Sequence, residues 1–329
     1  MVPRAAPGGG SRASVGTYGA MAREARRFRE AEARLWRSLR VEPVDRRVDL
    51  PRMGVTLRVQ ELGEGPPVVF VHGATTSGAS WAPLAARLSG FRRIVLDRPG
   101  CGLSDPLREP LDARSLPGFG ETLVVDVLDA LGVGTAHVVA SSFGGYVALR
   151  TAAAHPDRVG RLVLFGWPAG VGSGRIPGHV RMTTVPMLGR LLSEGRPTES
   201  MVRGVFRLLR HRASLEAGRI TAQDLAAYRA LLGDTRTMTN EFKTATALIR
   251  PLRGMKKALV LDEELLARVK APTYLVWGEN DPFGGEETAR RLAEALPHAE
   301  LEIVPGGGHA PWFDDVPHAV QVTSRWLSG

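Results

Sequence analysis

Two adjacent serines, Ser141 and Ser142, stand between an apolar run and a Gly-Gly pair in the stretch VVASSFGGYVALR. A serine hydroxyl is a weak nucleophile until a base takes its proton, and a sharp strand-to-helix turn can expose it to a substrate. The structural alternative is that a serine only caps the following helix, because serine is a favoured N-cap residue. The stretch therefore indicates either nucleophilic chemistry at one serine or a plain turn.

The neighbours of the two serines distinguish them. A nucleophile on such a turn needs small residues two positions before and two positions after it, because backbone and neighbouring strands crowd there. Ser142 has Ala140 and Gly144 at those positions, whereas Ser141 has a valine and a phenylalanine. We therefore predict Ser142 as the nucleophile and Ser141 as a small residue at the base of the turn.

A serine nucleophile needs a histidine base and an acid that orients the histidine, in the chain order serine, acid, histidine for a turn of this type. The stretch VWGENDPF supplies Asp281, and VPGGGHAPWFDD supplies His309 on a glycine-rich loop. We predict these two as acid and base, with Glu279 as the alternative acid. Three other histidines lie near helical segments and are expected at the surface: His155, His298 and His318.

The oxyanion that forms during attack on a carbonyl needs two backbone N–H donors. One should follow the nucleophile directly, at Phe143, and the other should come from the loop HGATTSG after an early strand, at Ala74. His72 and Gly73 in that loop are expected to support it. For His72 we favour hydrogen bonds to backbone over a direct catalytic role.

Cys101 is the only cysteine, and nothing around it resembles a nucleophile turn, so we expect a small packed residue rather than a thiol nucleophile. A single cysteine forms no intramolecular disulfide, which favours a reducing, cytoplasmic location. No histidine, cysteine and carboxylate set has metal-ligand spacing, and no glycine-rich stretch continues into a phosphate loop. We therefore expect neither metal nor cofactor.

The elements that must position these residues alternate along the chain. Apolar runs that read as strands are separated by helical patterns, after an expected hairpin formed by RRVDL and VTLRVQEL. This order predicts an α/β fold with a mostly parallel, doubly wound sheet. Because the carboxyl ends of parallel strands share one edge, the candidate residues can meet there. The runs are PVVFVHG, RRIVLDRPG, AHVVASS, RLVLFG, APTYLVWG and AELEIVPGGG.

The same pattern divides the chain. Residues 1–20 read as a flexible tail, and residues 21–44 contain an amphipathic helix, packed on the domain or used as a lid. The α/β core should comprise residues 45–166 and 263–329. Between its two parts, residues 167–262 show helical stretches and no convincing strand; we call this segment the cap.

The net charge of +9 is unevenly distributed. Residues 1–60 carry 13 arginines against 6 acidic residues, and residues 171–262 carry 16 basic against 7 acidic residues. We favour a solvated surface; the alternative is a cap that attracts an anionic substrate or an acidic carrier protein. No nucleic-acid reader motif occurs, and no apolar run is long enough for a transmembrane segment or a signal peptide.

Five motifs in order resemble the α/β-hydrolase superfamily across residues 45–329: VHGA, DRPGCGLSD, ASSFGG, WGENDPF and GGGHAPWFDD. The resemblance implies a serine hydrolase with a helical lid.

Dehalogenases and epoxide hydrolases of this fold carry an aspartate nucleophile where this chain has Ser142. Meta-cleavage carbon–carbon hydrolases usually place a tryptophan directly after the histidine, whereas here Ala310 and Pro311 precede Trp312. Perhydrolase-like members have an aromatic residue where this chain has Ala74.

What remains is an esterase or lipase-like enzyme that cleaves a carboxylic ester of a small acyl substrate through an acyl-enzyme. Thioesterase and lactonase activities are close alternatives. A non-hydrolytic binding protein that retains the triad is an alternative of another class, although a binder has no need of nucleophile, base, acid and oxyanion loop together. We expect the substrate cleft to be lined by Met182, Met187, Leu188, Phe206 and Trp312.

Overall fold

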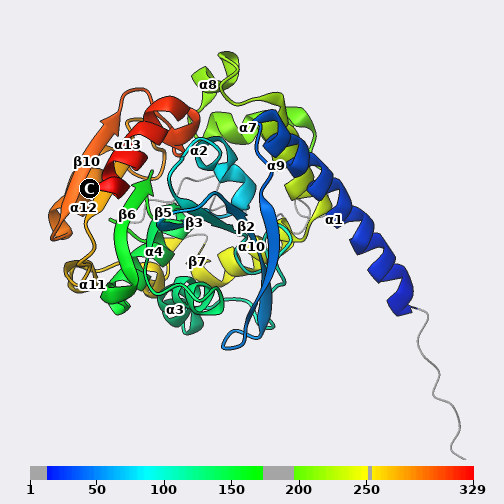
Figure 1. Cartoon of the computed structure of the whole chain (residues 1–329), viewed down its shortest axis with the longest axis horizontal. Helices are drawn as coiled ribbons and strands as arrows, with labels where there is room; N and C mark the ends of the chain where they lie inside the picture. Colours follow the sequence, from blue (N-terminus) through cyan, green and yellow to red (C-terminus); the bar gives the residue numbers. More distant parts are fainter. Residues whose placement is uncertain (1–12, 173–195, 251–253) are drawn as a thin grey trace, which may run out of the picture.

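The structure is a computed structural model that describes residues 13–172, 196–250 and 254–329. Eight strands form one sheet in the order β1-β2-β4-β3-β5-β6-β9-β10 (Figure 1). The expected hairpin pairs β1 (Val44–Leu50) with β2 (Val55–Leu62), and β2 is antiparallel to β4. The other pairings are parallel, which confirms the predicted fold class. The parallel strands are β3 (Pro67–Val71), β4 (Arg92–Leu96), β5 (Ala136–Ser141), β6 (Val159–Phe165), β9 (Thr273–Gly278) and β10 (Ala299–Val304).

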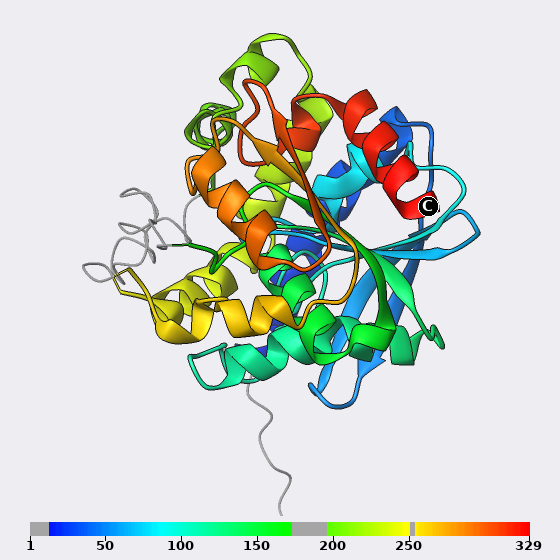
Figure 2. The same cartoon turned by 90° about the vertical axis from the view of Figure 1, so that its left-hand side faces the viewer.

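Helices cover both faces of the sheet (Figures 1 and 2). One face packs against α3 (Ser115–Ala130), α4 (Phe143–Ala154), α11 (Glu263–Ala267) and α12 (Glu286–Ala295). The other packs against α1 (Ala13–Ser38), α2 (Ala82–Ala85) and α13 (Val316–Ser328). Short 3₁₀ turns span Gly78–Trp81, Pro156–Arg158, Lys257–Leu259 and Pro311–Phe313.

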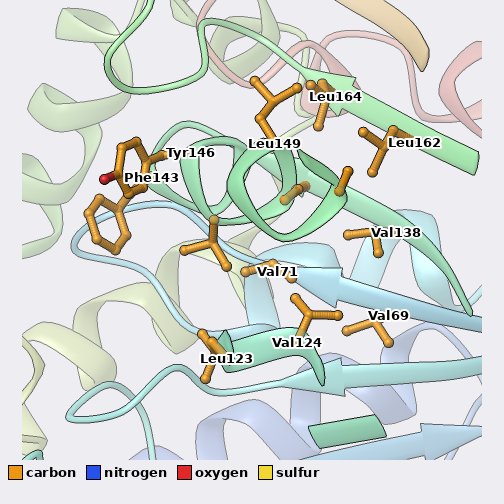
Figure 3. Close-up of a cluster of buried hydrophobic side chains, with 14 of the residues drawn as sticks. Val69, Val71, Leu123, Val124, Val138, Phe143, Tyr146, Leu149, Leu162 and Leu164 are labelled. Carbon is orange, nitrogen blue, oxygen red and sulfur yellow. The ribbon is translucent and has the colours of Figure 1, made fainter. Parts of the chain in front are cut away.

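The central strands are apolar throughout because both of their faces are buried. In β3, Val69 and Val71 belong to the hydrophobic cluster under α3 and α4, while Val68 and Phe70 belong to the cluster on the opposite face. Figure 3 shows the first cluster, in which side chains of β3, β5 and β6 meet those of the two helices. This two-sided packing holds the carboxyl ends of the strands at one edge.

The N-terminal segment differs from the expected tail of residues 1–20 and helix of residues 21–44. Helix α1 begins at Ala13, inside the expected tail, and ends at Ser38. Extending an existing helix costs far less than nucleating one, so a helix anchored at its C-terminal half can continue toward the N-terminus. The anchors are buried: Trp36 donates to Gln60, and Glu32 pairs with Arg58 at 2.6 Å. Residues 1–12 lie outside the described part of the chain.

The cap lies between β6 and β9 and contributes α7 (Glu199–Leu208), α8 (Arg212–Glu216), α9 (Ala222–Asp234) and α10 (Thr237–Leu248). It also contains a ladder that the sequence analysis did not predict, β7 (Ile249–Arg250) with β8 (Gly254–Met255), because two-residue strands show no alternating pattern. Met182, Met187 and Leu188, expected in the cleft, lie outside the described residues. Among the described helices, none combines the length and apolarity needed to cross a bilayer.

Candidate active site

Ser142 occupies the turn between β5 and α4 with φ 52° and ψ −120°, a conformation that non-glycine residues rarely adopt. Its hydroxyl makes no capping hydrogen bond to α4, which argues against the purely structural reading. Ala140 is fully buried, and a Cβ on Gly144 would lie 2.1 Å from the carbonyl oxygen of Val71. The neighbouring strand β3 therefore imposes the small residues on which the sequence prediction rested.

His309 and Asp281 meet as the sequence analysis expected. His309 Nδ1 lies 2.8 Å from Asp281 Oδ2, and both residues are buried. The same carboxylate accepts the backbone N–H groups of Trp167 at 2.8 Å and Phe283 at 2.9 Å. With Nδ1–H directed at the carboxylate, Nε2 is the ring nitrogen that can accept a proton. Glu279, the alternative acid, instead accepts the N–H of Gly306 at 2.7 Å.

One cavity of about 410 Å³ brings the candidate residues together. Ser142, His309, Ala74 and Phe143 all line it, although they come from three separate segments of the chain. Its wall is largely apolar, and two residues of the expected cleft, Phe206 and Trp312, belong to it. Further aromatic lining residues are Trp167, Tyr228, Phe242, Phe283 and Phe313.

The two expected oxyanion donors, Ala74 and Phe143, have no competing partner among the described residues, since neither N–H donates a hydrogen bond there. Phe143 is the first residue of α4, where a backbone N–H has no acceptor within the helix. A developing negative charge in the cavity can therefore recruit both groups.

His72 is a structural residue of the predicted oxyanion loop. Its Nε2 accepts the N–H of Arg98 at 2.9 Å, and its Nδ1 lies 2.8 Å from the carbonyl oxygen of Gly73. Burial, together with the positive charge of Arg98, holds the pKa of His72 well below its usual range. A neutral imidazole that is occupied at both nitrogens supports the loop and cannot serve as a base.

His211, a cap residue that the sequence analysis did not single out, holds the His309 loop. Its Nε2 accepts the N–H of Ala310 at 3.0 Å, and its Nδ1 lies 2.9 Å from Asp314 Oδ1. The carbonyl oxygen of Leu209 accepts the N–H of His309 itself at 3.0 Å. These contacts join residues about one hundred positions apart, so no local pattern marks them.

Cys101 is buried and donates its thiol to Glu241 Oε1 at 3.2 Å. Burial and the adjacent carboxylate raise the pKa of the Cys101 thiol well above its usual value. A thiolate is the reactive form of cysteine, so this environment argues against a nucleophilic role. Within the described ranges, no group of three or more potential metal ligands occurs.

Comparison with known proteins gives consistent matches. A family model described as the alpha/beta hydrolase family matches residues 68–321. A 2-hydroxy-6-oxononadienedioate/2-hydroxy-6-oxononatrienedioate hydrolase of Burkholderia vietnamiensis is 30% identical over 281 residues, which cover 80% of this chain and 89% of that protein. Its counterpart from Pseudomonas putida is 28% identical, with 79% of this chain and 87% of the relative covered.

Solved structures show the same fold. A 2-hydroxy-6-oxo-6-phenylhexa-2,4-dienoate hydrolase of Rhodococcus has a TM-score of 0.70 and 22% identity, with 88% of this chain and all of that chain covered. A carboxylesterase of Bacillus subtilis has a TM-score of 0.67 and 18% identity, covering 93% and 98% of the two chains. The similar proteins thus include meta-cleavage hydrolases, a class that the sequence analysis set aside, together with esterases.

Proposed function

The chain belongs to the alpha/beta hydrolase family and is a hydrolase, and on this premise we propose that it cleaves a carboxylic ester through an acyl-enzyme on Ser142. The observation that carries the proposal is the buried His309–Asp281 pair, whose imidazole lines the same apolar cavity as the strained Ser142. A strained serine, an oriented imidazole and two backbone N–H donors are the groups that acyl transfer requires.

In this mechanism Ser142 Oγ attacks the ester carbonyl while His309 Nε2 takes its proton. The oxyanion accepts hydrogen bonds from the N–H groups of Ala74 and Phe143. The imidazolium, stabilised by Asp281, then protonates the leaving alcohol, and an acyl-enzyme remains. Water attacks this intermediate in the same way, with His309 as base, and the carboxylic acid and free Ser142 are released.

The charges of the cavity favour an ester with an uncharged acyl group. The Burkholderia vietnamiensis and Pseudomonas putida relatives named above are hydrolases of dioates, which carry two carboxylates. Among the described lining residues the only arginine or lysine is Arg98, whose charge is paired with Glu241 at 3.0 Å, and Asp224 adds a negative charge. A dicarboxylate would therefore meet no unpaired cation in this part of the wall, which is why ester hydrolysis ranks first.

Carbon–carbon bond hydrolysis is the second candidate, because the named relatives are 28–30% identical over most of their length. The absence of a tryptophan directly after His309 is the observation against it, since Ala310 occupies that position. Thioesters and lactones would be cleaved by the same catalytic groups as esters. Because the cap is basic, thioesters of anionic acyl carriers should also be assayed.

The first test is hydrolysis of p-nitrophenyl esters of increasing acyl length by the wild type, Ser142→Ala and Ser141→Ala. We expect Ser142→Ala to lower kcat by at least about 10³-fold, since loss of a nucleophile leaves only residual catalysis. Ser141→Ala is the matched control, because it removes a neighbouring hydroxyl of the same type, and it should retain most activity.

A 2-hydroxy-6-oxo-dienoate should be assayed in parallel. Turnover of that compound with no ester hydrolysis would replace the proposed reaction with carbon–carbon bond cleavage. Full esterase activity in Ser142→Ala would disprove the nucleophile. A non-hydrolytic binding role would survive only if a fluorophosphonate probe failed to label Ser142 in the folded protein.

A further inference from the structure

The oxyanion loop contains a backbone conformation that its sequence does not favour. Thr75, directly after the proposed donor Ala74, has φ 57°, in the left-handed region that a β-branched residue rarely occupies. Two cap helices contact this residue. Glu241 on α10 accepts the N–H of Thr75 through Oε2 at 3.0 Å, and the hydroxyl of Tyr228 on α9 lies 3.5 Å from Thr75 Oγ1.

The peptide group on the other side of Ala74 is held by its carbonyl oxygen. Gly73 O accepts hydrogen bonds from Thr76 Oγ1 at 2.9 Å and Arg98 Nη2 at 2.9 Å, and it lies 2.8 Å from His72 Nδ1. In a planar trans peptide the N–H points opposite to the C=O. Fixing the carbonyl of Gly73 therefore fixes the direction of the Ala74 N–H.

Glu241 connects these two restraints. Its Oε1 accepts from Arg98 Nη2 at 3.0 Å, the same nitrogen that donates to Gly73 O, while its Oε2 holds Thr75. The Arg98 guanidinium also lies over the ring of Phe143, 4.7 Å from its centroid. Arg98 is 3% exposed, and the Glu241 side chain is 11% exposed, so water screens this pair little. A single carboxylate of the cap thus acts on both peptide groups that flank Ala74.

We propose that Glu241 is a positioning residue that sets the direction of the Ala74 N–H, so that the cap completes the oxyanion hole. The inference deepens the proposed function and rests on it. Without the carboxylate, Thr75 loses the acceptor that holds its strained backbone, and Arg98 loses the partner that holds its Nη2 against the carbonyl oxygen of Gly73. The Ala74 donor would then be displaced from the oxyanion.

The test compares Glu241→Ala and Glu241→Gln with Asn240→Ala, which is a matched control. Asn240 precedes Glu241 on the same helix and also ties the cap to the core, but its Nδ2 donates to Gly100 O at 2.8 Å and not to the oxyanion loop. The readouts are kcat and KM for an ester, and the rate at which a fluorophosphonate labels Ser142. Phosphonylation places the phosphoryl oxygen in the oxyanion hole, whatever substrate the enzyme prefers.

We expect Glu241→Ala to lower kcat and the labelling rate by about 10- to 100-fold with little change in KM, because misplaced groups cost transition-state binding. Glu241→Gln keeps an acceptor for Thr75 and should recover part of both rates. If Glu241→Ala does not fold, Glu241→Gln alone tests the proposal against the wild type. Asn240→Ala should stay near the wild type.

Equal slowing in Asn240→Ala and Glu241→Ala would reduce Glu241 to a general docking contact of the cap. A rise in KM alone, or an unchanged labelling rate in both Glu241 variants, would also overturn the inference. These outcomes differ from failure of the proposed function, in which Ser142 of the wild type is not labelled at all. In that case the inference falls with the function on which it rests.

Discussion

Two acidic residues two positions apart, Glu279 and Asp281, have carboxylates with different partners. Asp281 is buried and holds His309 Nδ1, whereas the exposed Glu279 holds the N–H of Gly306. Which of the two residues can orient His309 therefore depends on the direction in which each side chain leaves the turn after β9. Asp281 is fixed by two backbone N–H groups, so its carboxylate is oriented before any substrate arrives.

We expect Asp281→Asn to lower kcat by about 10⁴-fold for the best ester, since an amide no longer holds the imidazole in the productive tautomer. Glu279→Gln is the control, and it should change kcat little. Steady-state kinetics of the two purified variants provide the measurement. The reverse order of effects would transfer the role of the acid to Glu279.

At the scale of elements, two loops with proposed chemistry are held by the cap. Glu241 on α10 contacts the oxyanion loop, and the turn between α7 and α8 contacts the loop of His309 through Leu209 and His211. His211 is fully buried, and a Cβ on Gly308 would lie 2.6 Å from its ring. The glycines before His309 therefore allow this close approach as well as a loop turn.

Replacing His211 with alanine should lower the free energy of unfolding by about 2–4 kcal/mol, because it leaves a cavity and an unpaired N–H of Ala310. It also removes one partner of Asp314, whose carboxylate still accepts from Ser214 and Gly308. Urea unfolding of the full chain measures this loss. His318→Ala is a control with the same substitution, since His318 is part-exposed and pairs with Glu302; it should cost less than about 1 kcal/mol. Equal losses would contradict the assigned role of His211.

At the scale of the whole molecule, buried titratable groups couple stability to pH. Burial and Arg98 depress the pKa of His72 well below the ordinary 6.5. Below pH 6.5, His72 therefore binds a proton in the unfolded chain but stays unprotonated in the folded chain. This contribution to stability is complete above pH 6.5 and is lost as the pH falls below it.

We expect the free energy of unfolding of the wild type to fall with acidification more steeply than that of His72→Asn. The difference should approach about 1.4 kcal/mol per pH unit, the value for one proton. Urea unfolding at several pH values between 7.5 and 5.5 gives the slope of unfolding free energy against pH for each protein. This range brackets the ordinary histidine pKa of about 6.5. Equal slopes for the wild type and His72→Asn would mean that His72 has the same pKa in the folded and the unfolded chain.

Local patterns in the sequence were sufficient to predict the strands of the sheet and the order of the candidate site residues along the chain. Apolar runs predicted the parallel strands because a strand buried on both faces tolerates few polar residues, and those runs are β3, β4, β5, β6, β9 and β10. Small residues around Ser142 predicted the turn because β3 leaves no room for a side chain at Gly144. The roles of Ser142, Asp281 and His309 in catalysis stay predictions that the variants above test.

Only the tertiary structure decided how these parts are held. The start of α1 depends on its buried anchors rather than on a sequence signal at Ala13. Arg98 and Glu241 are 143 positions apart, and His211 and Ala310 are 99 apart. Such pairs leave no periodicity, because their contact arises from the way the cap packs across the edge of the sheet. The sequence by itself determined which residues reach that edge, and packing determined what orients them there.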